Sequence, residues 1–325
     1  MRSPAPPARR EAFRRVPVLR IHSAAIVYFD AVRRAGSIRE AARRLNVASS
    51  AVNRQILKLE AEIGTPLFER LPGGLKLTAA GEAIARHALV VLQDLERARS
   101  DVEGLRGARA GHITISTVEG VCGAVLPEVI GLLRARAPRV TVAVQTMGSF
   151  TIPDAIAAGD ADVGVAFALR RAPELRQVAL SRFKLGAVMA PAHPLAGRTT
   201  VSLAACLDHP IILATPDLSI NQLLGPALAR LPRSVEPCVT ASSIELMREL
   251  AERGAGIAFQ TRVGLERQLA EGRLVHVPLD SGGPVWSDLG VYVRSGRSLP
   301  AVLDLFLQIL GNALQEREQV ENARA

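Results

Sequence analysis

Residues 37–60 read SIREAARRLNVASSAVNRQILKLE. Apolar residues recur in this stretch at the spacing i, i+4, i+7, which is typical of one face of an amphipathic helix. They form two groups, Ile38, Ala42 and Leu45, and then Val52, Ile56 and Leu59. The residues between the groups, 46–49, are too few for anything but a tight turn. The stretch therefore predicts two short helices joined by a turn, the second with a polar outer face.

The residues on either side extend this pattern to three helices. A first helix is expected from about Ser23 to Arg34. Ser37 then takes the N-cap position of the second helix, with Glu40 three residues on, which is the signature of a capping box. The third helix should begin at Ser49 or Ser50 and continue towards Gly64, where a glycine can end it.

After Gly64 the chain continues with TPLFERLPGGLKLT. Two short extended pieces, Leu67–Arg70 and Leu75–Thr78, flank a Pro-Gly-Gly turn signal, which predicts a hairpin. Arg70 and Lys76 lie on this hairpin. Because it follows a pair of packed helices, the hairpin is interpreted as a wing that tracks a nucleic-acid backbone.

The polar residues of the third helix suit DNA. Asn53 can make a bidentate contact to adenine, and Arg54 can reach guanine or a phosphate. Ser49 and Ser50 stand at the helix start, where hydroxyls and backbone N–H groups suit phosphate oxygens. The alternative is an ordinary helical hairpin packed in a core, which the pattern alone does not exclude. The expected DNA contacts are Ser37, Ser49, Ser50, Asn53, Arg54, Lys58, Arg70 and Lys76.

The positive charge of the chain is concentrated in the same region. Residues 1–110 contain 20 Lys and Arg against 11 Asp and Glu, whereas residues 111–325 contain 20 of each. The whole formal net charge of +9 therefore lies in the first third of the chain. Segregated positive charge is the electrostatic footprint of phosphate binding. It favours double-stranded DNA as a partner over a merely solubilising surface.

The composition is that of a globular protein, with 48% hydrophobic residues and only 3% aromatic residues among 325. No apolar run reaches the roughly 18 residues of a membrane-spanning helix. Residues 1–20 are basic and proline-rich without the apolar region of a secretory signal, and they are expected to form a disordered tail. Cys122, Cys206 and Cys238 show neither metal-ligand spacing nor a disulfide framework. A cytoplasmic protein without membrane attachment is expected.

The segment AARRLNVASSAVNRQILKLEAEIGTPLFER, followed by LTAAGE, resembles the winged helix-turn-helix of the LysR-type transcriptional regulators over residues 21–82. The resemblance implies a DNA-binding domain at 21–78 in which Glu60 and Gly64 are structural. This chain has Ala48, Ser49 and Asn53 where the family usually has serine, glutamine and another serine, so the preferred DNA sequence stays open. The matching positions are Ala41, Ala42, Leu45, Val47, Ala51, Arg54, Gln55, Ile56, Leu59, Glu60, Gly64, Leu67, Phe68, Arg70, Leu77, Thr78 and Gly81.

Residues 79–106 predict one long linker helix. Its apolar residues alternate spacings of four and three, the heptad seam that pairs helices of two chains. A homodimer, or a tetramer made of two dimers, would place two heads on half-sites about 34 Å apart. The resemblance, in which this helix dimerises, points the same way, and the alternative is a helix packed on its own domain. The seam consists of Ile84, Ala88, Val91, Leu95, Ala98, Val102 and Leu105.

Beyond a glycine-rich hinge at 104–111, strand and helix patterns alternate to the end of the chain. This rhythm predicts an open parallel-type sheet with helices on both faces, divided between two similar α/β lobes. Ligands in such sheets bind beyond the carboxyl ends of the strands, near helix N-termini. Serine, threonine and aspartate in these loops are also ordinary helix caps. The candidate effector contacts are Thr117, Glu119, Gly120, Ser149, Phe150, Asp217 and Ser219.

The same half of the chain is similar to the effector domain of the LysR-type regulators, through GHITIS, LPEVIGLLRARAPRVTV, IAAGDADVGV, APAHPLAG, ELAERGAGIAF and GRLVHVPL. The resemblance implies a two-lobed periplasmic-binding-protein-like (type 2) domain at 111–312, with lobe I at 111–166 and 264–312 and lobe II at 167–263. The pocket would lie between the lobes. Val118 and Gly120 stand where many members have serine and threonine, which argues against a common aromatic-acid ligand. Glu119 would favour a cationic or hydroxyl-rich effector if it faces the pocket, and the alternative is that it only caps the helix.

The sequence offers no catalytic constellation. The six histidines form no metal-binding pair, and no dinucleotide, phosphate-loop or nucleophile-elbow motif is present. No catalytic residue, metal or cofactor is therefore expected besides a small-molecule effector. The leading hypothesis is a multidomain regulator that reads promoter DNA, answers to an effector and has RNA polymerase as a further partner. The alternatives are an α/β metabolic enzyme carrying a DNA-binding head and a non-specific nucleoid-type DNA-binding protein.

Overall fold

The computed structural model describes residues 24–105, 110–169, 172–230, 235–280 and 282–323. The expected basic tail at 1–20 and the middle of the glycine-rich hinge lie outside these residues. The chain divides into two compact units, one ending at Leu95 and one beginning at Glu96. Each unit has a hydrophobic core of its own. No helix within the described ranges is both long and apolar enough to cross a membrane.

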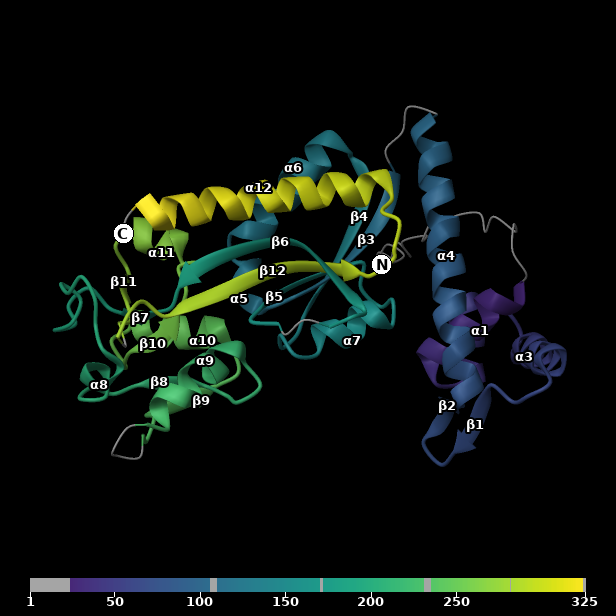
Figure 1. Ribbon diagram of the computed structural model, residues 1–325, viewed down its shortest axis with the longest axis horizontal. Coiled ribbons are helices and arrows are strands. Elements are labelled where there is room, and N and C mark those ends of the chain that lie inside the picture. The colour runs from purple at the N-terminus through teal and green to yellow at the C-terminus, as the bar shows by residue number, and fades with distance from the viewer. Residues whose placement is uncertain (1–23, 106–109, 170–171, 231–234, 281, 324–325) are drawn as a thin grey trace, which may run out of the picture. The chain divides into compact units, whose positions relative to one another are not determined.

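The first unit, called the head below, contains three short helices, a two-stranded ribbon and the start of a long helix (Figure 1). Ala41 and Ala42 are buried between the helices, where their small side chains allow close packing. The three predicted helices are confirmed, and the ribbon strands lie within one residue of the predicted positions. The elements are α1 (Ala24–Ala35), α2 (Ile38–Leu45), α3 (Ser49–Ile63), β1 (Phe68–Leu71) and β2 (Gly74–Leu77).

The capping box predicted at the start of α2 is wrong. Ser37 does occupy the N-cap position with an extended backbone, but its side chain accepts no capping hydrogen bond. Glu40 instead accepts hydrogen bonds from Arg43, at 2.7 and 2.8 Å, and from Arg44, at 2.9 Å. The predicted motif failed because two arginines one turn further along the helix compete for the same carboxylate.

The long helix α4 (Ala79–Leu105) matches the predicted linker, but its first half belongs to the head. Ala85 and Ala88 are buried in the head core, and Ile84 packs against them. Ala88 is therefore buried within its own chain and offers no accessible surface to the expected dimer seam, whereas Ile84 is only half-buried. The later seam residues remain accessible: Val91 and Leu95 are half-buried, and Ala98 and Val102 are exposed. The side chain of Leu105 lies outside the described part.

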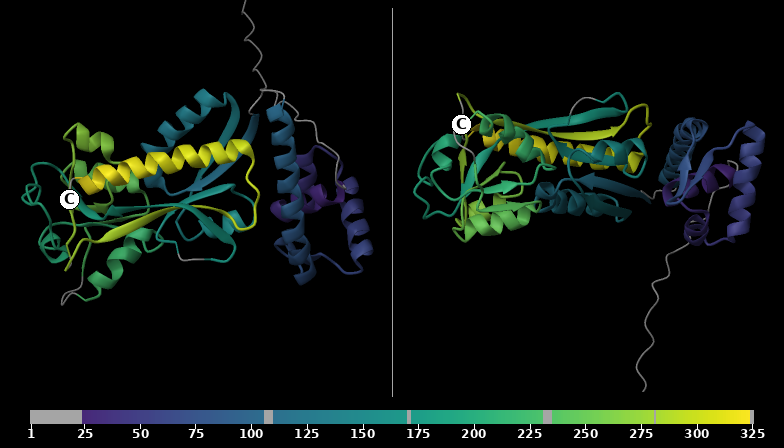
Figure 2. Two further views of the ribbon diagram at one scale, coloured as in Figure 1. Left: turned by 45° about the horizontal axis from the view of Figure 1, so that its top comes forward. Right: turned by 90° about the horizontal axis from the view of Figure 1, so that it is seen from below.

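The second unit contains a five-stranded sheet, which defines lobe I, in the order β4-β3-β5-β12-β6. Strands β3, β4 and β5 are parallel, whereas β12 runs antiparallel to both β5 and β6, so the sheet is mixed and not parallel throughout as predicted. The long helix α12 lies along α6 and β6 (Figures 1 and 2), and α7 packs on β5. The strands are β3 (Ala110–Thr117), β4 (Arg139–Thr146), β5 (Val163–Phe167), β6 (Leu175–Lys184) and β12 (Trp286–Arg294), and the helices are α5 (Glu119–Cys122), α6 (Val125–Arg136), α7 (Ile152–Ala157) and α12 (Ala301–Ala323).

Lobe II is built on an antiparallel sheet of order β10-β7-β11 and a parallel pair, β8 and β9. Its two hydrophobic clusters share no residue with the core of lobe I. Short helices cover both parts. The elements are β7 (Gly186–Met189), α8 (Leu203–Cys206), β8 (Ile212–Ala214), α9 (Ser219–Leu228), β9 (Val239–Ala241), α10 (Ile244–Glu252), β10 (Ala258–Gln260), α11 (Glu266–Ala270) and β11 (Val275–Pro278).

The chain changes lobes later than the sequence predicted. β6 pairs with β12 along its whole length, so the chain stays in lobe I to Lys184 and enters the core of lobe II at Leu185. It returns where β12 begins, at Trp286. The boundaries expected at 166–167 and 263–264 are corrected accordingly. The prediction failed because it assumed parallel strands throughout. β6 and β12 instead form an antiparallel pair that belongs to lobe I, so the chain leaves lobe I only after β6 and re-enters it at the start of β12.

Candidate functional site

Helix α3 presents a polar outer face opposite its buried Val52 and Ile56. Ser49, Ser50 and Arg54 are exposed on this face and Asn53 is half-buried. Arg54 makes no hydrogen bond or ion pair within the described part of the chain. The residue before the helix, Ala48, has no side chain able to cap it, so the first N–H groups of α3 remain available to an outside acceptor.

Two structural residues hold α3 against the ribbon. Glu60 accepts hydrogen bonds from the backbone N–H groups of Leu67, at 2.8 Å, and of Phe68, at 3.3 Å. Gly64 ends the helix with φ of 81°, a left-handed conformation that glycine adopts without steric cost. Both residues act on the scaffold, as the resemblance implied.

The two cations of the ribbon lie on opposite faces of it. Arg70 stands across from Leu75, and Lys76 across from Glu69, in adjacent pairs of the antiparallel register. Side chains of adjacent pairs point to opposite faces of a ribbon. Only one of the two cations can therefore share a face of the ribbon with α3. Both side chains are exposed.

Several other basic residues of the head are already paired. Asp30 accepts hydrogen bonds from Arg33 and Arg34, and the hydrogen bonds from Arg43 and then Arg44 hold the pKa of Glu40 at about 2. Lys58, an expected DNA contact, lies 3.7 Å from Glu62 in an exposed ion pair. Unlike these paired residues, Arg54 has no hydrogen-bond or ion-pair partner among the described residues. It can therefore bind a phosphate or a base edge without breaking an internal interaction.

The second unit contains a cavity of about 500 Å³ between lobe I and lobe II, called the interlobe cavity below. This volume lies within the range of small-molecule sites. Hydroxyl-bearing and apolar side chains dominate its walls. The lining residues are Val118, Glu119, Gly120, Thr146, Met147, Gly148, Ser149, Phe167, Asp217, Leu218, Ser219, Ile220, Ser242, Ser243, Ile244, Gln260, Thr261, Val263 and Ser287.

Five of the seven candidate effector contacts line this cavity: Glu119, Gly120, Ser149, Asp217 and Ser219. Thr117 does not line it, because it is fully buried at the end of β3. Phe150 does not line it either and is 37% exposed. Thr151 donates both its N–H and its hydroxyl to Gly148 O, which closes a turn in which Ser149 is buried and Phe150 faces outward.

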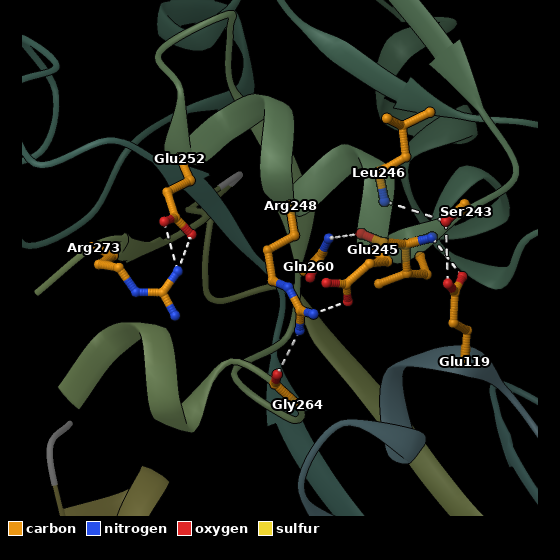
Figure 3. A network of polar contacts seen from close by, with 10 residues as sticks. Glu119, Ser243, Glu245, Leu246, Arg248, Glu252, Gln260, Gly264 and Arg273 are labelled. Carbon is orange, nitrogen blue, oxygen red and sulfur yellow. Dashed lines mark hydrogen bonds and ion pairs between the residues drawn. The ribbon is translucent and has the colours of Figure 1, made fainter. Parts of the chain in front are cut away.

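Glu119 connects the two lobes across the cavity. Figure 3 shows its side chain reaching from α5 of lobe I to the start of α10 in lobe II. One carboxylate oxygen accepts a hydrogen bond from the backbone N–H of Ile244 at 2.6 Å, and the other accepts one from Ser243 Oγ at 3.1 Å. Ser243 Oγ also caps α10 by accepting from the N–H of Leu246 at 3.2 Å. Glu119 thus caps a helix of the opposite lobe and lines the cavity as well.

The backbones of the lobes also approach closely beside Glu119. Gly264 has φ of 85°, and a Cβ atom placed on it would lie 2.2 Å from Gly120 O. Arg248 on α10 donates to Gly264 O at 2.9 Å and pairs with Glu245 (Figure 3). The guanidinium of Arg248 is therefore engaged by Gly264 and Glu245, and Arg248 is not among the residues that line the cavity. Gly264 has to be glycine for the lobes to pack at this point.

A second connection between the lobes runs through α12. Arg317 donates to Glu266 on α11 of lobe II at 3.0 Å and to Glu128 on α6 of lobe I at 2.7 Å. Its side chain is 18% exposed. The amino-acid sequence does not mark this arginine, because nothing in a helical pattern reveals two acceptors on other elements.

The cysteines do not form a reactive centre. Burial raises the pKa of the Cys206 thiol to about 12, and burial followed by the charge of Glu119 raises the pKa of the Cys122 thiol. The exposed Cys238 donates to Ile211 O at 3.1 Å. Among the residues that the structure describes, no three His, Cys, Asp or Glu side chains group as a metal site.

Comparison with known proteins decides the family. A model described as the LysR substrate binding domain matches residues 106–315, and one described as a bacterial regulatory helix-turn-helix protein of the lysR family matches residues 24–82. The chain belongs to the LysR family. It is a LysR-type transcriptional regulator with a DNA-binding helix-turn-helix domain and an effector-binding domain, and it is not an enzyme.

Relatives of this LysR-type regulator match it along most of their length. It is 23% identical over 273 residues to the RuBisCO operon transcriptional regulator of Allochromatium vinosum, covering 84% of this chain and 90% of that one. A full-length OxyR from Pseudomonas aeruginosa shares the fold with a TM-score of 0.69 at 17% identity, covering 89% of this chain and 95% of that one. The effector binding domain of QuiR in complex with shikimate has a TM-score of 0.54 at 13% identity, covering 64% and 98%.

Proposed function

We propose that this regulator binds promoter DNA sequence-specifically by placing α3 in the major groove. The observation that carries the proposal is the outer face of α3, where Arg54 is exposed without an internal partner beside the uncapped helix start at Ser49 and Ser50. Arg54 and Asn53 read base edges, and the serines hold phosphates. Arg70 or Lys76 adds a backbone contact from the ribbon, and Lys58 and Ser37 contribute at the margin.

The second half of α4 joins two chains. Val91, Leu95, Ala98 and Val102 continue the heptad pattern beyond the part of the helix that packs on the head, and Val102 is 50% exposed. Two heads on one dimer reach successive major grooves on the same side of DNA. A pair of such dimers forms a tetramer that spans adjacent half-sites.

The effector binds in the interlobe cavity, at Glu119, Gly120, Ser149, Asp217 and Ser219. The shikimate complex of the similarly folded QuiR domain supports a small organic molecule as the occupant of such a domain. Binding shifts the population of lobe arrangements by the difference in affinity for them, and so changes the spacing of the heads on DNA. The regulator acts in the cytoplasm, and RNA polymerase is the partner that responds to the changed DNA.

The test is binding of the full chain to its own upstream DNA, compared with a shuffled fragment of equal composition at two salt concentrations. A sequence-specific factor prefers its site by at least about 10³-fold, and phosphate contacts make both affinities fall steeply with salt. A large ratio is expected. A ratio near one for every genomic fragment would contradict sequence-specific binding and favour the nucleoid-type alternative.

A further inference from the structure

The N-terminus of α10 is the natural place for an anionic ligand in the interlobe cavity. A helix N-terminus offers unpaired N–H groups and the positive end of the helix dipole. Here the position is occupied by a carboxylate of the chain itself, because Glu119 accepts from Ile244 N and from Ser243 Oγ. Ser243, Ile244 and Glu119 all line the cavity. An incoming carboxylate would have to displace Glu119 before it could use these donors.

The remaining charge of the cavity also opposes anions. Among the described residues that line it, Glu119 and Asp217 are acidic, and none is lysine, arginine or histidine. The other helix that opens at the cavity, α9, begins at Ser219, and Asp217 stands two residues before it. Glu119 is thus hydrogen-bonded at the start of α10, whereas Asp217 lines the cavity close in sequence to the start of α9.

The other polar groups of the lining suit a ligand that carries hydroxyl or ammonium groups. The Oγ of Ser149 is buried without a hydrogen-bond partner, and the residue is only 1% exposed. Its hydroxyl can both donate and accept, so a ligand group placed against it completes a hydrogen bond that the protein leaves unmade. Further hydroxyls come from Thr146, Ser219, Ser242, Thr261 and Ser287.

We infer that Glu119 determines the ligand class of the interlobe cavity by holding the anion position of α10, so that carboxylates are excluded and the effector is an uncharged or cationic donor of hydrogen bonds. The inference rests on the proposed function of the cavity as the effector site. It assigns Glu119 two effects, since the same carboxylate connects the lobes and rejects acids.

The experiment measures binding of benzoate, benzylammonium and myo-inositol to the full chain by calorimetry and thermal shift, without DNA. Glu119→Ala vacates the N-terminus of α10. Glu119→Gln removes the charge but leaves an acceptor in place, and Asp217→Asn is the matched control that removes the same charge elsewhere in the cavity. Benzoate should bind Glu119→Ala at least about tenfold more tightly than wild type, as a charge-assisted hydrogen bond gained in a buried site predicts.

The gain in affinity for benzoate should be smaller in Glu119→Gln than in Glu119→Ala, and smallest in Asp217→Asn. If the preferred ligand is cationic, Glu119→Gln and Asp217→Asn should both bind benzylammonium more weakly than wild type. If the preferred ligand is uncharged, the affinity for myo-inositol should be the same in these variants as in wild type. If Glu119→Ala does not fold, a larger benzoate gain in Glu119→Gln than in Asp217→Asn still supports the inference, and equal values oppose it. Two outcomes would overturn the inference about Glu119. In the first, wild type and Glu119→Ala bind benzoate with the same affinity, and in the second no variant binds benzoate.

The location of binding separates this inference from the proposed function. Ser242 lines the cavity and is exposed, so Ser242→Trp added to Glu119→Ala should fill the cavity and abolish the benzoate gain. Retained benzoate binding in that double variant would place the ligand elsewhere and overturn both the inference and the cavity as effector site. Failure of operator binding alone would contradict only the DNA-binding proposal.

Discussion

Helices α3 and α10 begin in opposite ways. α3 starts after Ala48 without a side-chain cap, and the nearby Arg54 makes no hydrogen bond or ion pair within the described residues. α10 starts with Ser243 as its cap and has the carboxylate of Glu119 on its first N–H. An open N-terminus beside a cation suits the phosphates of DNA, whereas an occupied one repels anions. If both proposals hold, the same structural element gives the head and the interlobe cavity opposite charge selectivity.

The largest loss of operator affinity is expected from disrupting the proposed dimer seam of α4. This seam would bring the uncapped α3 helices of two chains to the same DNA. Leu95→Asp places a charge in that seam and should yield monomers, since an unpaired buried charge is strongly unfavourable. Loss of the second head should lower operator affinity about 100-fold or more. Sedimentation and DNA titration measure the two effects. Val90→Asp, at an exposed position on the same helix outside the seam, is the control, and a dimeric Leu95→Asp would place the interface elsewhere.

A second prediction concerns the tight approach of the lobes beside the occupied helix. Gly264→Ala combines a positive φ with a Cβ that would lie 2.2 Å from Gly120 O, so we expect a loss of about 3 kcal/mol in the free energy of unfolding. Gly272→Ala, with φ of 66° and open space around it, should lose only about 1 kcal/mol. Urea unfolding followed by the fluorescence of the single tryptophan, Trp286, measures both. Equal losses would show that the lobes can separate here at no cost.

Arg54→Ala tests whether the unpaired cation of α3 is free for DNA. The variant should lose about ten- to a hundredfold in operator affinity, which is the value of one good base or phosphate contact. Its melting temperature should stay unchanged, because Arg54 has no partner within the described part of the head to lose. Arg86→Ala, at an exposed position on α4, is the control and should keep wild-type affinity. A melting temperature that fell together with affinity would assign Arg54 a structural role instead.

The head was predictable from sequence because its contacts follow local periodicity. The apolar spacing of residues 38–59 predicted α2 and α3, and the αL conformation of Asn46, with φ of 55°, is one that asparagine tolerates. The failures there are also local: Ser37 makes no side-chain cap on α2, and Glu40 pairs with Arg43 and Arg44 instead of reaching back to Ser37. Ala88 was wrongly expected in the dimer seam, because a heptad pattern does not tell whether a residue is buried within its own chain or against a second chain.

The interlobe cavity was only partly predictable, because loops from distant parts of the chain converge on it. Residues beyond strand ends were found where helix-capping patterns marked them, as at Glu119 and Asp217. Gln260 and Thr261 were missed although Gln260 ends β10 and Thr261 follows it, so the strand-end rule would have found them. Ser287 lies at the start of β12, where the chain has just returned to lobe I, and no local pattern marks such a position.

The smallest effect is expected from a buried histidine of lobe II, in contrast to the exposed cations of the head. Burial, and then the charge of Arg262, lower the pKa of His276 to about 4, and its Nε2 lies 3.1 Å from Gln260 O. In the unfolded chain its pKa returns to the ordinary value near 6.5. Between these two values the unfolded state binds more protons, so stability is complete above about pH 6.5 and is lost as the pH falls towards 4.

From pH 7 to pH 5.5 this linkage should lower the free energy of unfolding by about 1 kcal/mol. Urea unfolding at the two pH values measures the loss, and His276→Asn is the control, because it removes the titrating group and leaves the other histidines in place. The pH-dependent loss should shrink by about that amount in the variant. An unchanged pH dependence would mean that His276 titrates normally in the folded protein, and that the interior beside Gln260 admits charge as readily as the surface of the head.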